Sequence, residues 1–272
     1  MITTVQLPAL NDNYSLSASQ VDSFRINGHV LLRAVASREE VASYRPIINN
    51  AVLKNNKENR KLEDRDTYGK AFLQITNLWE TDEEVKKFTL AKRFAGIAAR
   101  LLGVEKVRVY HDQALYKEAG GGHTPWHQDQ YYWPLDTPNT ITMWMPLVDI
   151  SKETGMLRFA SGSHRKGFVE NIPISDKSEE ILQQHIKSQN YPISTPDYMS
   201  AGDATWHAGW TLHSAPGNAS DSLTREVMTI IYFADGAKII EPQNEHQEAD
   251  RNRWLKGMPA GSLAASELTP LV

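Results

Sequence analysis

Residues 123–133, HTPWHQDQYYW, contain a histidine and a carboxylate at a spacing that suits metal binding. His127 and Asp129 are two positions apart, so on an extended strand both side chains point to the same face and can bind one ion. A third ligand is needed, and His207 and His213 in WHAGWTLHSAPGN are candidates among the remaining histidines. Two histidines and one carboxylate on one side of a metal leave three coordination positions open, the arrangement of a non-haem Fe(II) oxygenase. A lone His-x-Asp pair also arises by chance, and then it is commonly a solvated surface pair.

Arg225 is the next residue whose type and position suggest chemistry. It opens the apolar segment REVMTIIYFAD twelve residues after His213, so a hairpin return could point its side chain into the same cavity. A buried arginine in an apolar barrel needs a carboxylate partner, which its planar guanidinium binds through two parallel hydrogen bonds. The alternative is an exposed arginine at the start of a strand.

Composition limits the other functions that the chain can have. Its 272 residues, 40% hydrophobic and 23% charged, exclude disorder and fibrous repeats. Lys and Arg total 29 against 33 Asp and Glu, so we expect neither nucleic acid nor a membrane among the partners. The absence of cysteine excludes disulfides, metal–thiolate sites and thiol nucleophiles, so any metal must be held by histidines and carboxylates. With no signal-peptide pattern and no run of eighteen apolar residues, we expect a soluble, cytoplasmic protein.

Helices are expected to dominate residues 15–103. Three capping-box patterns precede periodic apolar segments, at Ser17–Gln20, Ser37–Glu40 and Thr81–Glu84. Residues 85–102 carry apolar side chains at helical spacing and stop at Gly103, which predicts one long helix or a helix pair. Short strands are expected at 29–33 and 72–76, and the charged residues 55–66 are expected to form a solvated, mobile loop.

From residue 104 the apolar pattern changes to a period of two. It is found in VRVYHDQALYK, TITMWMPLVD, MLRFA and REVMTIIYFAD, with one helix expected near 177–188. Without repeats or low-complexity linkers, residues 1–272 are expected to form a single domain. In it, the helix-rich part 15–103 packs on a β core at 104–236, and the tail 237–272 is irregular apart from a short helix near 246–255. Periodicity does not decide between a sandwich, a closed barrel and a jelly roll.

Three segments together resemble the phytanoyl-CoA dioxygenase family of Fe(II)- and 2-oxoglutarate-dependent oxygenases. They are HQDQYYWP, TITMWMPLVDISKETGMLRFASGSHRKG and GDATWHAGWTLHSAPGN, the last followed by an arginine. The resemblance covers about residues 20–236 and is specific from 110 to 235. It implies a mainly β fold with flanking α-helices, whose core is a double-stranded β-helix of the jelly-roll or cupin-like type.

The resemblance also implies a role for individual residues. His127, Asp129 and His213 would bind iron, and Arg225 would bind the distal carboxylate of 2-oxoglutarate. His207 is then a supporting residue and not a ligand. Relatives that halogenate carry a small residue in place of the acid, so the presence of Asp129 argues against halogenation.

Three more residues are expected beside 2-oxoglutarate, each with core packing or surface exposure as the alternative interpretation: Trp144, Thr142 and Gln113. Many family members place a serine two positions after the distal histidine, where it assists the cosubstrate carboxylate. This chain instead has Ser214 followed by Ala215, which leaves that contact open.

The expected activity is that of a dioxygenase with Fe(II), 2-oxoglutarate and O2 as cofactors. We expect hydroxylation of an unactivated C–H of a small, largely apolar metabolite, such as a natural-product intermediate, by a monomer or homodimer. Succinate and CO2 would be released. The absence of a basic cluster near the site, apart from Arg158, Arg165 and Lys166, favours a free small molecule over a thioester.

Three aromatic residues near the predicted ligands, Tyr131, Trp133 and Trp210, are expected to line an apolar substrate pocket. Core packing explains such aromatics equally well. The same enzyme class also catalyses desaturation, epimerisation and ring formation, which the ligand set does not distinguish from hydroxylation. Two further possibilities are a non-redox cupin-like metal-binding protein and an interaction protein in which the His-x-Asp pair is incidental.

Overall fold

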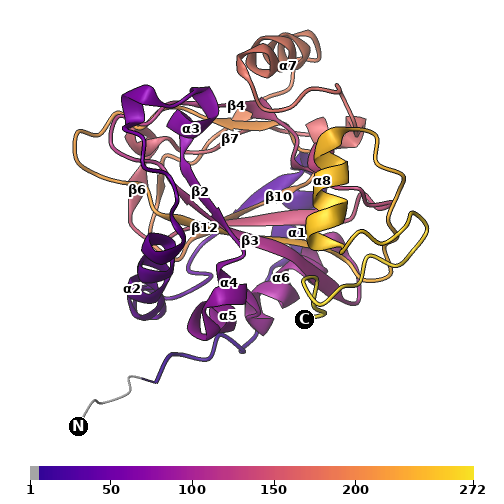
Figure 1. Ribbon diagram of the computed structural model, residues 1–272, viewed down its shortest axis with the longest axis horizontal. Coiled ribbons are helices and arrows are strands. Elements are labelled where there is room, and N and C mark those ends of the chain that lie inside the picture. The colour runs from indigo at the N-terminus through magenta and orange to yellow at the C-terminus, as the bar shows by residue number, and fades with distance from the viewer. Residues whose placement is uncertain (1–5) are drawn as a thin grey trace.

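Two large antiparallel β-sheets, a further two-stranded sheet and the helices around them make up the structure, a computed structural model that describes residues 6–272 (Figure 1). Residues 1–5 of the expected domain lie outside the described residues. The elements in chain order are α1 (Ala18–Asn27), β1 (His29–Leu32), α2 (Arg38–Asn55), η1 (Leu62–Asp64), α3 (Thr67–Ala71), β2 (Leu73–Thr76), α4 (Leu78–Thr81), α5 (Glu83–Thr89), α6 (Lys92–Leu102), β3 (Val107–Tyr116), β4 (Thr124–His127), η2 (Asp129–Tyr132), β5 (Thr140–Pro146), β6 (Ile150–Ser151), η3 (Lys152–Thr154), β7 (Arg158–Ala160), η4 (Ser163–Lys166), α7 (Asp176–Ser188), β8 (Ile193–Ser194), β9 (Tyr198–Met199), β10 (Ala204–Ala208), β11 (His213–Ala215), β12 (Val227–Ala234) and α8 (Glu245–Trp254).

The strands pair across long stretches of sequence. The larger sheet has six strands in the order β1-β10-β5-β12-β3-β2, and the smaller has four in the order β4-β11-β7-β8. Every neighbouring pair in the two sheets is antiparallel. In Figure 1 the strands β4 and β7 lie on one side of the larger sheet, and α4, α5 and α6 lie on the other. This arrangement confirms a mainly β fold with flanking helices.

The alternation of side chains along the central strands separates the core from the cavity. On β5, Ile141, Met143 and Met145 join the main hydrophobic cluster, to which α6 contributes. Thr142 and Trp144 on the same strand face a cavity between the two sheets. Because of the period of two in the sequence, alternate side chains of β5 face the helical layer and the candidate site.

A β-bulge breaks this alternation on β3. Ile231 of β12 is opposite His111, but the next residue, Tyr232, is opposite Val109, so Tyr110 has no partner of its own. Because of this extra residue, Tyr110 packs in the cluster with Trp254 on the cavity side, although its neighbour His111 also lines the cavity. The simple alternation expected from VRVYHDQALYK is therefore wrong at this point.

The N-terminal helices begin largely where the sequence predicts. Ser17 and Ser37 form capping boxes with Gln20 and Glu40. The third predicted cap is wrong: Thr81 ends α4, and α5 begins after Asp82, whose carboxylate accepts from the backbone N–H groups of the first turn. The predicted helix at 85–102 is a pair, α5 and α6, and α6 ends at Gly103 in the left-handed conformation.

Two other expectations need correction. Residues 55–66 are not wholly solvated, because Arg65 is buried and forms an ion pair with Glu118. The tail is less irregular than expected, since Leu271 pairs with Arg108 in a β-bridge and α8 packs through Trp254 against the sheet. These contacts join segments far apart in the chain, so no local sequence pattern predicts them.

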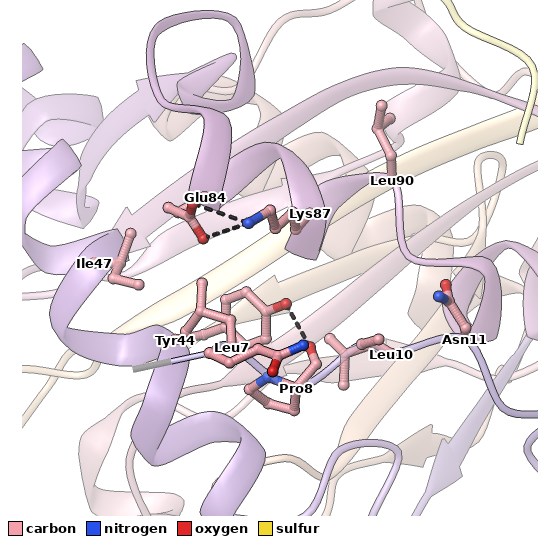
Figure 2. Close-up of a pocket in the computed structure, with 11 residues that line it drawn as sticks. Leu7, Pro8, Leu10, Asn11, Tyr44, Ile47, Glu84, Lys87 and Leu90 are labelled. Carbon is pink, nitrogen blue, oxygen red and sulfur yellow. Dashed lines mark hydrogen bonds and ion pairs between the residues drawn. The ribbon is translucent and has the colours of Figure 1, made fainter. Parts of the chain in front are cut away.

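The segment before α1 packs on two helices (Figure 2). Tyr44 of α2 donates a hydrogen bond to the carbonyl oxygen of Pro8 (2.7 Å), and Lys87 of α5 forms an ion pair with Glu84 (2.9 Å). A hollow of about 780 Å³ lies beside them and contains no histidine. Within residues 6–272, no helix is both long and apolar enough to cross a bilayer.

Candidate active site

Three side chains that the sequence predicts as metal ligands converge between the sheets. His127 ends β4, His213 begins β11, and the two residues are direct partners in the register of the smaller sheet. Asp129 follows in η2, with Oδ1 at 3.5 Å from His127 Nε2 and 3.6 Å from His213 Nε2. One donor atom from each residue lies within 4.8 Å of the other two. The group can therefore hold one metal ion from one side.

Hydrogen bonds to the backbone set the tautomers of both histidines. The Nδ1 atom of His127 lies 2.8 Å from the carbonyl oxygen of Pro125, and that of His213 lies 3.0 Å from the carbonyl oxygen of Thr211. A carbonyl oxygen only accepts, so each Nδ1 carries the proton and each Nε2 keeps its lone pair. Both Nε2 atoms thus lie near Asp129 with a lone pair available to coordinate a metal cation.

Two neighbours orient the carboxylate of Asp129. Oδ2 accepts hydrogen bonds from Thr142 Oγ1 (2.8 Å) and His207 Nε2 (3.1 Å), which leaves Oδ1 beside the two other histidines. Burial raises the pKa of Asp129, but the neighbouring His213 and the hydrogen bond from His207 outweigh it and hold this pKa well below its usual range. Asp129 is therefore a carboxylate at neutral pH.

The pKa of the ligand His213 is also shifted. Burial, together with the field of His127, holds the pKa of His213 well below its usual value. The imidazole is therefore neutral at physiological pH, which is the form that binds metals.

Arg225 lies in the same cavity, which measures about 290 Å³. It is 1% exposed, and its guanidinium lies 5.2 Å from the ring centre of Trp144. Its one hydrogen bond goes to the carbonyl oxygen of Gly155, and its Nε has no partner. Burial lowers the pKa of Arg225 to about 9, so the group stays charged at neutral pH. Most of its hydrogen-bonding capacity faces no protein acceptor among the described residues.

The three residues expected beside the cosubstrate all line this cavity. Trp144 contacts Arg225, and Thr142 donates to Asp129, as described above. Gln113 is on β3, opposite Thr229 of β12. Their contacts with 2-oxoglutarate stay predictions.

The three residues expected to bind substrate lie in different places. Trp133 lines the cavity. Tyr131 is buried and packs against Tyr132, outside the cavity lining, and Trp210 is half-buried with its ring edge toward Phe168. Substrate binding by these residues stays a prediction.

The residue two positions after His213 is Ala215, where the family resemblance implies a serine. Ala215 lines the cavity, whereas Ser214 accepts a hydrogen bond from Arg158 (3.2 Å). The register pairs Ala215 with Thr124 of β4, so a threonine hydroxyl lies across from the missing serine.

Sequence reasoning missed the wall formed by α8, β2 and α3. Asp250 accepts a hydrogen bond from Tyr110 (3.0 Å), and Arg253 donates to Thr76 Oγ1 on β2 (2.9 Å). Burial raises the pKa of Asp250 to about 7. Further cavity residues that no motif indicated are Tyr68, Phe72, Gln74 and Trp254, whereas Tyr132 and His111, which also line the cavity, are close in sequence to the predicted ligands. These residues come from distant segments, and no local sequence pattern relates them to the metal ligands.

Comparison with known proteins agrees with the geometry. Residues 24–227 match the model of the family described as phytanoyl-CoA dioxygenase. A phytanoyl-CoA dioxygenase of Arabidopsis thaliana is 25% identical over 162 residues, which are 59% of this chain and 56% of that protein. An L-proline trans-4-hydroxylase of Streptomyces griseoviridis is 26% identical over 171 residues, which are 56% of this chain and 63% of that protein. The match therefore spans less than two thirds of the length of either relative.

Solved structures share the fold over nearly the whole chain. The non-haem alpha-ketoglutarate-dependent carbocyclase SnoK of nogalamycin biosynthesis has a TM-score of 0.78 at 25% identity, covering 95% of this chain and 97% of that one. The epimerase SnoN of the same biosynthesis has a TM-score of 0.74 at 22% identity, covering 93% and 96%. EctD of S. alaskensis has a TM-score of 0.73 at 19% identity, covering 96% and 90%. These similarities confirm the predicted double-stranded β-helix.

Proposed function

The chain belongs to the phytanoyl-CoA dioxygenase family, and from that premise we propose that it is a non-haem Fe(II)- and 2-oxoglutarate-dependent dioxygenase. The family uses iron and 2-oxoglutarate. The observation that carries the proposal is the convergence of His127, Asp129, His213 and Arg225 in one cavity of about 290 Å³. A cupin-like protein without redox chemistry would need the first three residues but not a buried, unpaired arginine beside them.

The donor set fits iron. Two imidazole Nε2 atoms with fixed tautomers and one ionised carboxylate form the facial triad that leaves positions for the cosubstrate and oxygen. When bound, iron with 2-oxoglutarate and O2 supplies the oxidising power that converts a substrate C–H to C–OH, with release of succinate and CO2.

The chain's own residues supply positioning. The guanidinium of Arg225 has free N–H groups that match a carboxylate bidentately, so it fixes the far end of 2-oxoglutarate. Thr142 and His207 hold Asp129 so that one oxygen faces the metal. Arg225, His127 and His213 are buried between the two sheets, which strengthens their electrostatic contacts.

The cavity wall indicates the kind of substrate. Aromatic and aliphatic side chains make up much of the cavity lining: Tyr68, Phe72, Tyr132, Trp133, Ile174 and Trp254. Arg253 and Asp250 on α8 are among the polar groups of the lining. Since 2-oxoglutarate takes part of a volume of about 290 Å³, the remaining space suits a small molecule and not a coenzyme A thioester. We propose a small, largely apolar metabolite that carries one polar group toward α8.

Hydroxylation is the proposed outcome, and ring formation is the second candidate. The second rests on the similarity to the carbocyclase SnoK, which covers 95% of this chain at 25% identity. Product mass distinguishes the two outcomes, because hydroxylation adds one oxygen atom to the substrate whereas ring closure removes two hydrogen atoms.

The anaerobic visible spectrum of the protein with Fe(II), before and after 2-oxoglutarate, tests the enzyme class. We expect a metal-to-ligand charge-transfer band in the wild type and none in Asp129→Ala. Asp197→Ala is the matched control, because Asp197 is an exposed carboxylate paired with Lys152 outside the cavity lining. No band in folded, iron-loaded wild type would contradict the proposal and favour the non-redox alternative.

A further inference from the structure

Arg225, which lines the cavity, has a second basic residue as its neighbour, Lys117, which lies behind the lining and has no role in the proposed function. Lys117 and Arg225 form an isolated antiparallel bridge in which each backbone N–H donates to the other residue's carbonyl, at 3.0 and 2.9 Å. Directly opposed residues of such a pair project from the same face. Lys117 is 0% and Arg225 1% exposed, so both charges are removed from water.

Neither cation has an anionic partner among residues 6–272. Lys117 Nζ donates to the carbonyl oxygen of Gly122 and lies 3.5 Å from Thr124 Oγ1. Glu118, the carboxylate next to Lys117 in the chain, forms its ion pair with Arg65 instead. Two adjacent buried charges without a counter-charge are costly, so a charged Lys117 beside Arg225 is favoured only when an anion is bound nearby.

The lysine reaches the cavity wall through a threonine. Thr124 lines the cavity and is the register partner of Ala215, which also lines it. The stem of Lys117 runs against Gly155, where a Cβ would lie 3.0 Å from Lys117 Cδ. The carbonyl oxygen of that same Gly155 accepts the hydrogen bond from Arg225. The side chains of Lys117 and Arg225 therefore both lie against Gly155. The hydroxyl of Thr124 lies beside the amine of Lys117.

We propose that Lys117 is a positioning residue for the distal carboxylate of 2-oxoglutarate, which it supports through Thr124, and that it takes up one proton from solvent when the cosubstrate binds. The inference rests on the proposed function. It differs from a simple second ligand because the lysine changes its charge during binding.

The charge change follows from the surroundings of the lysine. Burial, followed by the field of Arg225, lowers the pKa of Lys117 to about 6, so its amine is mostly neutral at pH 7.5. A carboxylate nearby favours the ammonium form and raises that pKa. A proton is then bound with the ligand, so affinity for 2-oxoglutarate falls as pH rises above about 6, by up to about tenfold per unit.

Calorimetry of the Mn(II)-loaded protein tests the proton uptake without turnover. 2-Oxoglutarate is titrated at pH 7.5 in phosphate and in Tris, whose ionisation enthalpies differ, and the difference in heat gives the number of protons bound. Pyruvate is the matched ligand, because it offers the same 2-oxo acid to the metal but has no distal carboxylate. We expect close to one proton for 2-oxoglutarate beyond that for pyruvate.

Three variants localise the effect. Lys117→Met keeps the length of the stem and removes the amine, so we expect the extra proton to disappear and the affinity for 2-oxoglutarate to fall about 10-fold or more, with pyruvate unchanged. Thr124→Val weakens 2-oxoglutarate in the same selective way. Lys70→Met is the control, since Lys70 lies beside the same glycine loop but outside the cavity lining, and it keeps wild-type values.

The outcomes separate this inference from the proposed function. If wild type binds 2-oxoglutarate with no more protons than pyruvate, the inference is wrong and the oxygenase assignment stands. The same conclusion follows if Lys117→Met lowers thermal stability but keeps the ratio of the two affinities, because the lysine then only holds the Gly122 loop. Failure of metal-loaded wild type to bind either 2-oxo acid would overturn the proposed function itself. The wild-type measurement decides the question even if Lys117→Met does not fold.

Discussion

At the scale of single residues, the candidate site depends on hydrogen bonds that orient its metal-binding atoms. Both ligand histidines owe their free Nε2 to a backbone carbonyl two residues before them in the chain. This geometry arises because His127 ends β4 and His213 begins β11. A His-x-Asp motif therefore forms a ligand pair only where the chain is extended up to the histidine. The sequence pattern was informative because metal binding requires these residue types at fixed spacing.

Removing the support of Asp129 weakens the metal site without removing a ligand. We expect His207→Leu and Thr142→Val each to lower the affinity for Fe(II) by about 10- to 100-fold, since each deletes one hydrogen bond to Oδ2. Anaerobic Fe(II) titration, followed by calorimetry, measures the change. His123→Leu, at an exposed histidine outside the cavity lining, is the control. Unchanged affinity in both variants would show that Oδ2 plays no part in orienting the carboxylate.

The residues that sequence reasoning missed share a physical cause. His111, Tyr68 and Trp254 lie on β3, α3 and α8 and meet only at the cavity. Each has an ordinary packing role by composition, and no spacing rule relates one to the others. Arg225 was predictable because a buried arginine at a strand start, in the right order after the distal histidine, matches a carboxylate ligand.

At the scale of elements, one buried aspartate joins the helical layer to the larger sheet. Asp112 of β3 accepts hydrogen bonds from the backbone N–H of Leu78 (2.8 Å) and Trp79 (3.2 Å), and from Thr89 Oγ1 (2.7 Å). It therefore caps α4 from outside that helix, where Asn77 makes no side-chain cap bond. The capping patterns in the sequence could not reveal this, because the capping group is 34 residues away from Leu78.

Loss of this contact should destabilise the fold more than loss of an ordinary cap. We expect Asp112→Ala to lower the free energy of unfolding by about 2–4 kcal/mol, because it leaves buried donors without acceptors. Asp82→Ala, which removes the cap of α5 at a partly exposed position, should cost only about 1 kcal/mol. Urea denaturation of both variants measures the difference. Equal losses would mean that water replaces the contacts of Asp112.

At the scale of the whole molecule, the cavity connects the two sheets. Its metal ligands come from β4, η2 and β11, whereas the residues that support Asp129 come from β5 and β10. A ligand bound there therefore contacts both sheets at once and stabilises their packing. The single-domain expectation agrees with this arrangement and stays a prediction.

We expect the unfolding temperature to rise most with Mn(II) and 2-oxoglutarate together, less with Mn(II) alone and least with 2-oxoglutarate alone. Mn(II) with 2-oxoglutarate at 100 times its dissociation constant adds about 2.7 kcal/mol, which corresponds to about 5–10 °C for a chain of this size. Differential scanning calorimetry in the absence of oxygen measures the shift. We expect Mn(II) alone to give part of it and 2-oxoglutarate without metal to give little. An equal shift from 2-oxoglutarate in the presence of EDTA would place its binding away from the triad.

The bulge on β3 and the strict alternation on β5 and β12 have a consequence for how this protein can change. Side chains that face the cavity, such as His111, Gln113, Thr229 and Ile231, are a different set from those that hold the helical layer, such as Met143, Ile230 and Tyr232. A combinatorial library confined to the first set would leave the second untouched. The molecule can therefore acquire a new substrate range by point mutation while the packing of its helical layer stays the same, which makes the cavity face a natural starting surface for directed evolution.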